Sequence, residues 1–154
     1  MTAASVEREQ HVRSAHPPAW LMRIANPVTR AVAGSRLGRR FGSLTVLHFE
    51  GRKSGRHYAI PVMAYDYNGA PVVFTDARWA ANFAATAPVG VRRGGRTRAG
   101  IARVAGPRET ADGLRAVLAT LRSPRGVGLA IDEGHEPTDA ELNAVRTMVC
   151  LDLD

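Results

Sequence analysis

The chain has 154 residues, of which 45% are apolar and 23% charged, and its formal net charge is +7. This length fits one domain that buries a core without disulfides, and no run approaches the ~20 apolar residues of a membrane-spanning helix. Since Lys53 is the only lysine, nearly all the positive charge is arginine. That charge favours an anionic partner such as nucleic acid, acidic lipid or a phosphorylated small molecule, although a GC-rich genome explains an arginine bias equally well. The single cysteine, Cys150, excludes an internal disulfide and predicts a reducing, cytoplasmic location.

The amino-terminal region divides into a polar arm and an amphipathic helix. Residues 1–18 are polar and end in a Pro-Pro pair, so we expect a flexible or weakly helical arm. Residues 19–34 space apolar side chains by three and four, which predicts a helix that Pro27 kinks or splits. A core-covering helix is the favoured interpretation, and a helix resting on a membrane or a partner is the alternative. The apolar face is formed by Trp20, Ile24, Val28 and Ala31.

Six short segments of β-forming composition follow, and hairpin signals join several of them. Asn68-Gly69 and Gly94-Gly95 are dipeptides typical of two-residue hairpin turns. Pro61, inside the second segment, predicts a sheet edge or a bulge. Thr138 and Glu141 predict a capping box. The expected strands are 42–50, 57–67, 70–76, 89–93, 96–106 and 147–154; the expected helices are 78–88, 108–122 and 138–146, with a Gly/Pro-rich connection at 123–137.

This order of elements indicates a mainly β protein with flanking helices, an α+β arrangement. Because antiparallel hairpins predominate, a small closed or split β-barrel is the expected architecture. Residues 19–154 would form this single barrel domain.

The turn Gly51-Arg-Lys-Ser-Gly55 carries the main candidate binding site. Glycines let backbone N–H groups approach an anion, and the Ser54 hydroxyl with the Arg52 and Lys53 side chains would add charge-assisted donors. A strand follows this turn, whereas a Walker phosphate loop is longer and precedes a helix. A phosphate site and a solvated basic hairpin turn are equally good interpretations of the spacing.

Four stretches of the chain together resemble the deazaflavin-dependent nitroreductase family. The first is LTVLHFEGRKSGRHYAIPV at residues 44–62, and the second is Trp79-x-x-Asn82-Phe83 with Pro88 and VGV after it. The third is Asn26-Pro27 in the leading helix, and the fourth is the run 146–150 into the last strand. The resemblance covers residues 20–106 well and the remainder loosely.

The resemblance implies a split β-barrel of the FMN-binding, pyridoxine-phosphate-oxidase-like kind that binds coenzyme F-420, an anionic deazaflavin. It implies hydride transfer from the reduced coenzyme to a quinone, nitro or enone-type acceptor. Met63 stands where nitro-reducing members carry a pocket tyrosine, and the segment before Trp79 is short, so FMN is the second candidate cofactor. By matched position the implied cofactor-binding residues are Arg52, Lys53, Ser54, Gly55, Arg56, Pro61, Val62, Thr75, Asp76, Trp79 and Asn82, with Tyr58 and Tyr65, or His57, as candidate proton donors.

Two rival functions stay open on the sequence alone. The same barrel could hold FMN, heme or another anionic ligand without F-420 chemistry. A basic protein that binds nucleic acid or a membrane surface is the second rival, although we expect no nucleic acid because aromatic residues do not alternate with the arginines at 92–98. Peripheral membrane contact and a homodimer are further alternatives. We expect no metal site, because His135 and its acidic neighbours do not follow a ligand spacing, and we expect His48 to be a core histidine.

Overall fold

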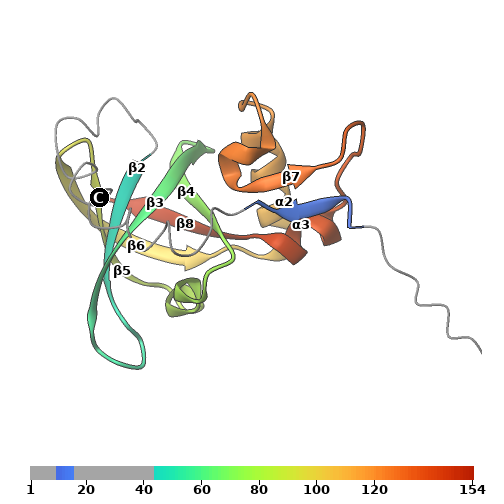
Figure 1. The fold of residues 1–154 in the computed structure, drawn as a ribbon. Helices are drawn as coiled ribbons and strands as arrows, with labels where there is room; N and C mark the ends of the chain where they lie inside the picture. The colour runs from blue at the N-terminus through green and yellow to red at the C-terminus, as the bar shows by residue number, and fades with distance from the viewer. Residues whose placement is uncertain (1–9, 16–43) are drawn as a thin grey trace, which may run out of the picture.

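The computed structural model describes residues 10–15 and 44–154, and its main element is a closed antiparallel β-barrel (Figure 1). Neighbouring strands follow the order β2-β3-β4-β8-β6-β5, which confirms the predicted fold class. The hairpins predicted at Asn68-Gly69 and Gly94-Gly95 are present; Asn68 and Gly69 both have positive φ, at 51° and 78°, as such a turn requires. The strands are β2 Leu44–Glu50, β3 His57–Tyr67, β4 Ala70–Thr75, β5 Ala87–Arg93, β6 Arg96–Val104 and β8 Thr147–Leu153.

The barrel is split along β3, which changes its neighbour halfway. Residues 57–63 pair with β2, whereas residues 64–67 pair with β4. Pro61 lies opposite Val46 of β2, and no strand of the described residues pairs with it on its other side. The predicted edge position is therefore confirmed, and it suits a residue that has no N–H to donate.

Pro88 corrects the predicted helix at 78–88. The helix is the 3-10 segment η2 Arg78–Phe83, and Pro88 already belongs to β5, opposite Ile101 of β6. β5 pairs with β2 only from Gly90 onward, so Pro88 occupies a second one-sided stretch of strand. A proline signals the end of a helix or the edge of a strand equally well, and the barrel decides between them.

The barrel interior is filled by alternate residues of the strands together with side chains of η2. Leu47 and Phe49 point inward, and Phe83 closes the barrel from η2; each of the three is at most 4% exposed. This alternation is the period of a strand that is apolar on one face. The buried cluster comprises Leu47, Phe49, Ala64, Val73, Ala80, Phe83, Val89, Val91, Ala102, Val149 and Leu151.

A second layer packs against the outer face of β3, β4 and β8 (Figure 1). It contains the helices α2 Pro107–Leu118 and α3 Asp139–Val145, the 3-10 turn η3 Pro124–Val127 and the short strands β1 Val12–Ser14 and β7 Leu129–Ile131. The capping box predicted for α3 is present at Thr138 and Glu141. Leu114, Leu129 and Leu142 are fully buried between these elements, so the layer has a core of its own.

The pairing of β1 with β7 corrects two predictions. Residues 12–14 were expected in a loose or weakly helical arm and residues 123–137 in an irregular connection, yet Val12 lies opposite Ile131 in an antiparallel pair. Three-residue strands are too short to show a periodicity, and their pairing joins distant parts of the chain. The helix predicted at 19–34, with its Asn26-Pro27 motif, lies outside the described residues. In the part of the chain that the structure describes, no helix has both the length and the apolar character needed to cross a bilayer.

Candidate functional site

The turn between β2 and β3 is held in shape by its own backbone. The Gly55 N–H donates to the Gly51 carbonyl and the Gly51 N–H to the Arg56 carbonyl, both at 2.8 Å. Gly55 adopts φ +66°, a left-handed conformation that favours glycine. The Arg56 N–H donates to Ser54 Oγ at 3.2 Å. The Ser54 hydroxyl therefore braces the turn, while its own N–H and that of Lys53 have no partner among the described residues.

Asn82 fastens this turn to η2. The Arg52 N–H donates to Asn82 Oδ1 at 2.8 Å, and Asn82 Nδ2 donates to the Trp79 carbonyl at the same distance. The amide of Asn82 thus bridges two segments that lie thirty residues apart in the sequence. The structure brings together the two motifs, Gly-Arg-Lys-Ser-Gly and Trp-x-x-Asn, that the sequence singled out separately.

The turn displays an uncompensated positive charge. Arg52, Lys53 and Arg56 are exposed, and no described carboxylate pairs with them. Three cations and two open N–H groups on one six-residue turn form a donor set suited to phosphate or carboxylate oxygens.

Aromatic rings lie beneath the turn. Tyr58 stacks on Phe49 with ring centroids 5.5 Å apart, and Phe83 meets Phe49 edge-on at 5.1 Å. Trp79 lies 6.2 Å from both Phe49 and Phe83. Offset and edge-to-face contacts of this kind stabilise a rigid cluster, so the turn rests on a fixed apolar base.

Gly51→Ala is expected to distort this arrangement. A Cβ at Gly51 would lie 2.5 Å from Ser54 Oγ and 2.8 Å from Tyr58 Cε2, so the turn or the tyrosine ring must shift. Overpacking of this size costs about 1–3 kcal/mol, measured as the change in unfolding free energy in urea. Ser54→Ala, which removes only the hydroxyl, is expected to cost less. Equal stability of Gly51→Ala and the wild type would show that the site tolerates a side chain.

The remaining predicted binding residues lie along the barrel toward η2. Val62 packs against the barrel core, whereas Pro61, its neighbour in β3, faces the other side of the strand. Thr75 Oγ1 accepts a hydrogen bond from the Ala77 N–H at 3.0 Å, and Asp76 Oδ2 lies 3.5 Å from Arg146 Nη1. These contacts are within the protein, so the contact of Thr75 and Asp76 with a cofactor stays a prediction.

The two candidate tyrosines lie in different places. Tyr58 lies beside the turn and is 39% exposed. Tyr65 points outward from β3 into the second layer, where its hydroxyl donates to the Gly126 carbonyl and burial raises the pKa of the phenol. Only Tyr58 is therefore placed beside the turn.

A histidine pair next to the turn was not predicted from the sequence. His48 is not a core residue: it lies partly exposed on the outer face of β2, with Nδ1 3.3 Å from His57 Nε2. Partial burial first, and then the charges of His57 and Arg92, lower the pKa of His48. The two histidines lie on antiparallel strands, and only the register of β2 on β3 shows that they meet.

This pair predicts a loss of stability in acid. Because the pKa of His48 in the folded state lies below its ordinary value of 6.5, the unfolded chain binds the proton more tightly. The contribution of His48 is therefore present above pH 6.5 and lost as the pH falls through the folded-state value. Melting temperatures measured from pH 8 to pH 5 should fall, and His48→Gln should flatten that fall. An unchanged pH profile in His48→Gln would contradict the assignment.

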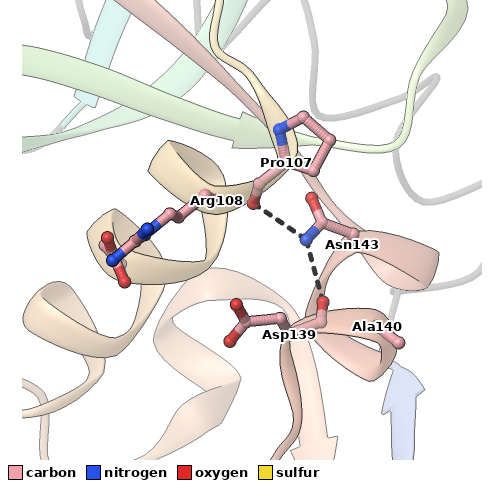
Figure 2. A pocket seen from close by; sticks show the side chains of 6 residues that line it. Pro107, Arg108, Asp139, Ala140 and Asn143 are labelled. Atoms are coloured by element: carbon pink, nitrogen blue, oxygen red, sulfur yellow. Dashed lines mark hydrogen bonds between the residues drawn. The ribbon is translucent and has the colours of Figure 1, made fainter.

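A shallow groove of about 600 Å³ lies elsewhere, where α2 meets α3. Figure 2 shows Asn143 bridging this junction: its Nδ2 donates to the Pro107 carbonyl at 2.9 Å and to the Asp139 carbonyl at 2.8 Å. Arg108 and Asp112 line the same groove. None of the predicted site residues lies there, and the Asn143 contacts hold the two helices together.

No cluster of three or more histidine, cysteine or acidic residues within residues 10–15 and 44–154 is arranged to hold a metal ion. His135 instead contacts Glu141, with Nε2 2.9 Å from Oε2, and stacks on His11 at a centroid distance of 4.6 Å.

No protein-family model matches the chain, and the comparison with curated proteins finds no match. Solved structures do match. HutZ, the heme storage protein from Vibrio cholerae, matches with a TM-score of 0.50 at 10% identity over 76% of this chain and 85% of its own. An F420-H2 dependent reductase, FDR-A, matches with a TM-score of 0.46 at 17% identity over 70% of this chain and 93% of its own. An FAD and heme binding protein from Mycobacterium smegmatis matches with a TM-score of 0.49 at 16% identity over 83% of this chain and 65% of its own.

Identities this low show a shared fold and not a shared activity. The match to HutZ, together with the strand order, supports the split barrel. This chain therefore has a split β-barrel fold, which it shares with HutZ.

Proposed function

We propose that this protein is a deazaflavin-dependent reductase whose 51–56 turn binds the anionic part of reduced coenzyme F-420. The observation that carries the proposal is the clamp between Arg52 and Asn82, which holds an exposed cationic turn against η2. A solvated hairpin turn would need no such clamp. Two of the four stretches that resemble the deazaflavin-dependent family, Gly-Arg-Lys-Ser-Gly and Trp-x-x-Asn, meet here.

The donor set fits the proposed ligand. Coenzyme F-420 carries a phosphate and glutamate carboxylates, and the turn offers Arg52, Lys53 and Arg56 with the open N–H groups of Lys53 and Ser54. Guanidinium groups can bind such oxygens in bidentate fashion. When bound, the coenzyme supplies a hydride for an acceptor of the quinone, nitro or enone type.

The chain's own residues would bind and orient rather than react. Asn82 fixes the turn backbone, which leaves the side chains of the turn free to contact oxygens. The stack of Phe49 and Tyr58 would give an apolar surface for a flat ring beside the turn. Tyr58 is the proposed proton donor, because its ring lies beside the turn whereas the Tyr65 hydroxyl is bonded to the Gly126 carbonyl.

A titration of the purified protein tests the proposal against its rivals. Reduced F-420, FMN and hemin are added separately, and binding is followed by absorption and by protein fluorescence. The reduced coenzyme is then mixed with protein and a panel of quinones, enones and nitroaromatics. Tight binding of F-420 with acceptor-dependent loss of its reduced form is the expected result. Uptake of FMN or hemin alone, or F-420 binding without turnover of any acceptor, would overturn it.

A salt series separates specific binding from attraction to the net charge of +7. Binding of duplex DNA or anionic vesicles is measured between 50 mM and 200 mM salt, as is binding of F-420. Purely electrostatic binding falls steeply over this range. We expect DNA and vesicle binding to vanish at the upper concentration while F-420 stays bound; the reverse would favour a nucleic-acid or membrane-surface protein.

A further inference from the structure

Arg146 is a buried cation at the junction of the barrel and the second layer. Arg146 is only 3% exposed, and burial lowers the pKa of its guanidinium. Its nitrogens donate to the carbonyls of Val127 at 3.2 Å, Gly128 at 2.6 Å and Val145 at 2.6 Å, and to Ser14 Oγ at 2.9 Å. Arg146 thus binds four oxygens that belong to β1, η3, α3 or residues flanking them. Because a buried charge needs such partners, these contacts hold the segments in one arrangement.

The carboxylate facing this cation comes from the barrel. Asp76 lies 3.5 Å from Arg146 Nη1 and follows directly after β4, two residues before η2 begins. In Figure 1, β4 runs into η2, the short green helix beneath the barrel, while the second layer lies to its right. The ion pair therefore ties the start of η2 to the second layer.

Two residues of η2 contact the turn or the aromatic rings beside it. Asn82 accepts the Arg52 N–H, and Trp79 contributes to the aromatic base under Tyr58. A shift of η2 would move both Asn82 Oδ1, which accepts the Arg52 N–H, and the Trp79 ring of the aromatic cluster. Arg146 is thus connected to the turn through its contact with Asp76, the short segment η2 and the hydrogen bond from Arg52 to Asn82.

We propose that Arg146 and Asp76 are positioning residues that set η2, and through Asn82 the cationic turn, from the second layer. Asp76 then acts through Arg146 and not by contact with the cofactor, which differs from the role implied by family resemblance. The expected effect on F-420 affinity rests on the proposed function, whereas the expected effect on the hydrogen bond of the Arg52 N–H does not.

Amide hydrogen exchange of the Arg52 N–H tests the inference without any ligand. Asp76→Asn keeps the shape of the side chain and removes its charge. Because a partly exposed ion pair contributes little free energy, we expect the exchange rate of the Arg52 N–H to rise only roughly three- to tenfold. Exchange at Leu47 and Val149 in the barrel core should stay unchanged. Asp139→Asn, which breaks the exposed pair between Asp139 and Arg115 at 2.5 Å, is the matched control and should leave Arg52 unaffected.

A double-mutant cycle shows whether Asp76 acts through Arg146. Arg146→Gln alone, which removes the positive charge, should also raise exchange at Arg52, and adding Asp76→Asn to it should change little more. Additive effects would overturn the inference, as would unchanged exchange at Arg52 in Asp76→Asn or an equal rise in the barrel core. Should Arg146→Gln fail to fold, the comparison of Asp76→Asn with Asp139→Asn still tests the inference.

The cycle is repeated with F-420 binding as a second measurement. Asp76→Asn should weaken binding in the wild-type background and not in Arg146→Gln. A full loss in both backgrounds would assign Asp76 a direct contact and overturn the positioning role. If the wild-type protein binds no F-420, the proposed function fails, and the exchange at Arg52 alone judges the inference.

Discussion

Gly100→Ala is expected to prevent the barrel from closing normally. Gly100 of β6 lies opposite Leu153 of β8, and a Cβ there would overlap the Asp152 carbonyl oxygen and lie 2.9 Å from Leu153 Cα. These neighbours are backbone atoms, so the clash is relieved only by moving one strand away from the other. We expect a loss of about 3 kcal/mol or more in unfolding free energy, measured by urea denaturation, or a fall in soluble yield.

Gly90→Ala is the matched control, since it adds the same methyl group to another strand of the barrel. The new Cβ would meet His48 Cβ at 3.4 Å, an ordinary contact, and alanine suits a strand better than glycine does. We expect little change in stability. If Gly100→Ala proved as stable as Gly90→Ala, the close approach of β6 and β8 would be wrong.

The second large effect is expected at the cationic turn. The triple variant R52Q/K53Q/R56Q keeps the backbone hydrogen bond from Arg52 to Asn82 and removes the three charges. Charge-assisted hydrogen bonds to anionic oxygens are strong, so F-420 affinity should fall on the order of 100-fold or more at low ionic strength. The measurement is the dissociation constant from a fluorescence titration, and stability should change little because the three side chains are exposed.

A second triple variant separates a specific site from overall charge. R108Q/R122Q/R125Q neutralises three exposed arginines of the second layer and likewise lowers the formal net charge from +7 to +4. If the turn is the binding site, this variant binds F-420 nearly as well as the wild type does. Equal loss in the two variants would mean that long-range attraction alone accounts for binding.

Features that depend on residues close together in the sequence could be predicted. Asn68-Gly69 forms its hairpin because these two residues tolerate positive φ, and the capping box of α3 needs only Thr138 and Glu141. The strand pattern around Leu47 and Phe49 follows from the alternation of the pleat. Each of these signals acts within one turn or one strand, so the sequence was sufficient to predict the barrel and the position of the cationic turn.

The roles of individual side chains could not be predicted in the same way. Tyr58 and Tyr65 are both strand residues of β3, yet one lies beside the turn and the other is bonded to Gly126 in the second layer. His48 meets His57 only through the register of β2 on β3. Each outcome depends on which face of a strand is covered and by which distant segment, and neither composition nor spacing records that.

The sequence by itself therefore determined the six barrel strands, the hairpins and the Gly-Arg-Lys-Ser-Gly turn, because backbone preference and alternation are local properties. Only the tertiary structure decided that Asn82 receives the Arg52 N–H, that Val12 pairs with Ile131, and that Arg146 is buried facing Asp76. These contacts join residues that lie 30 to 119 positions apart in the sequence. Their free energy therefore appears only once the barrel has closed and the second layer has packed against it.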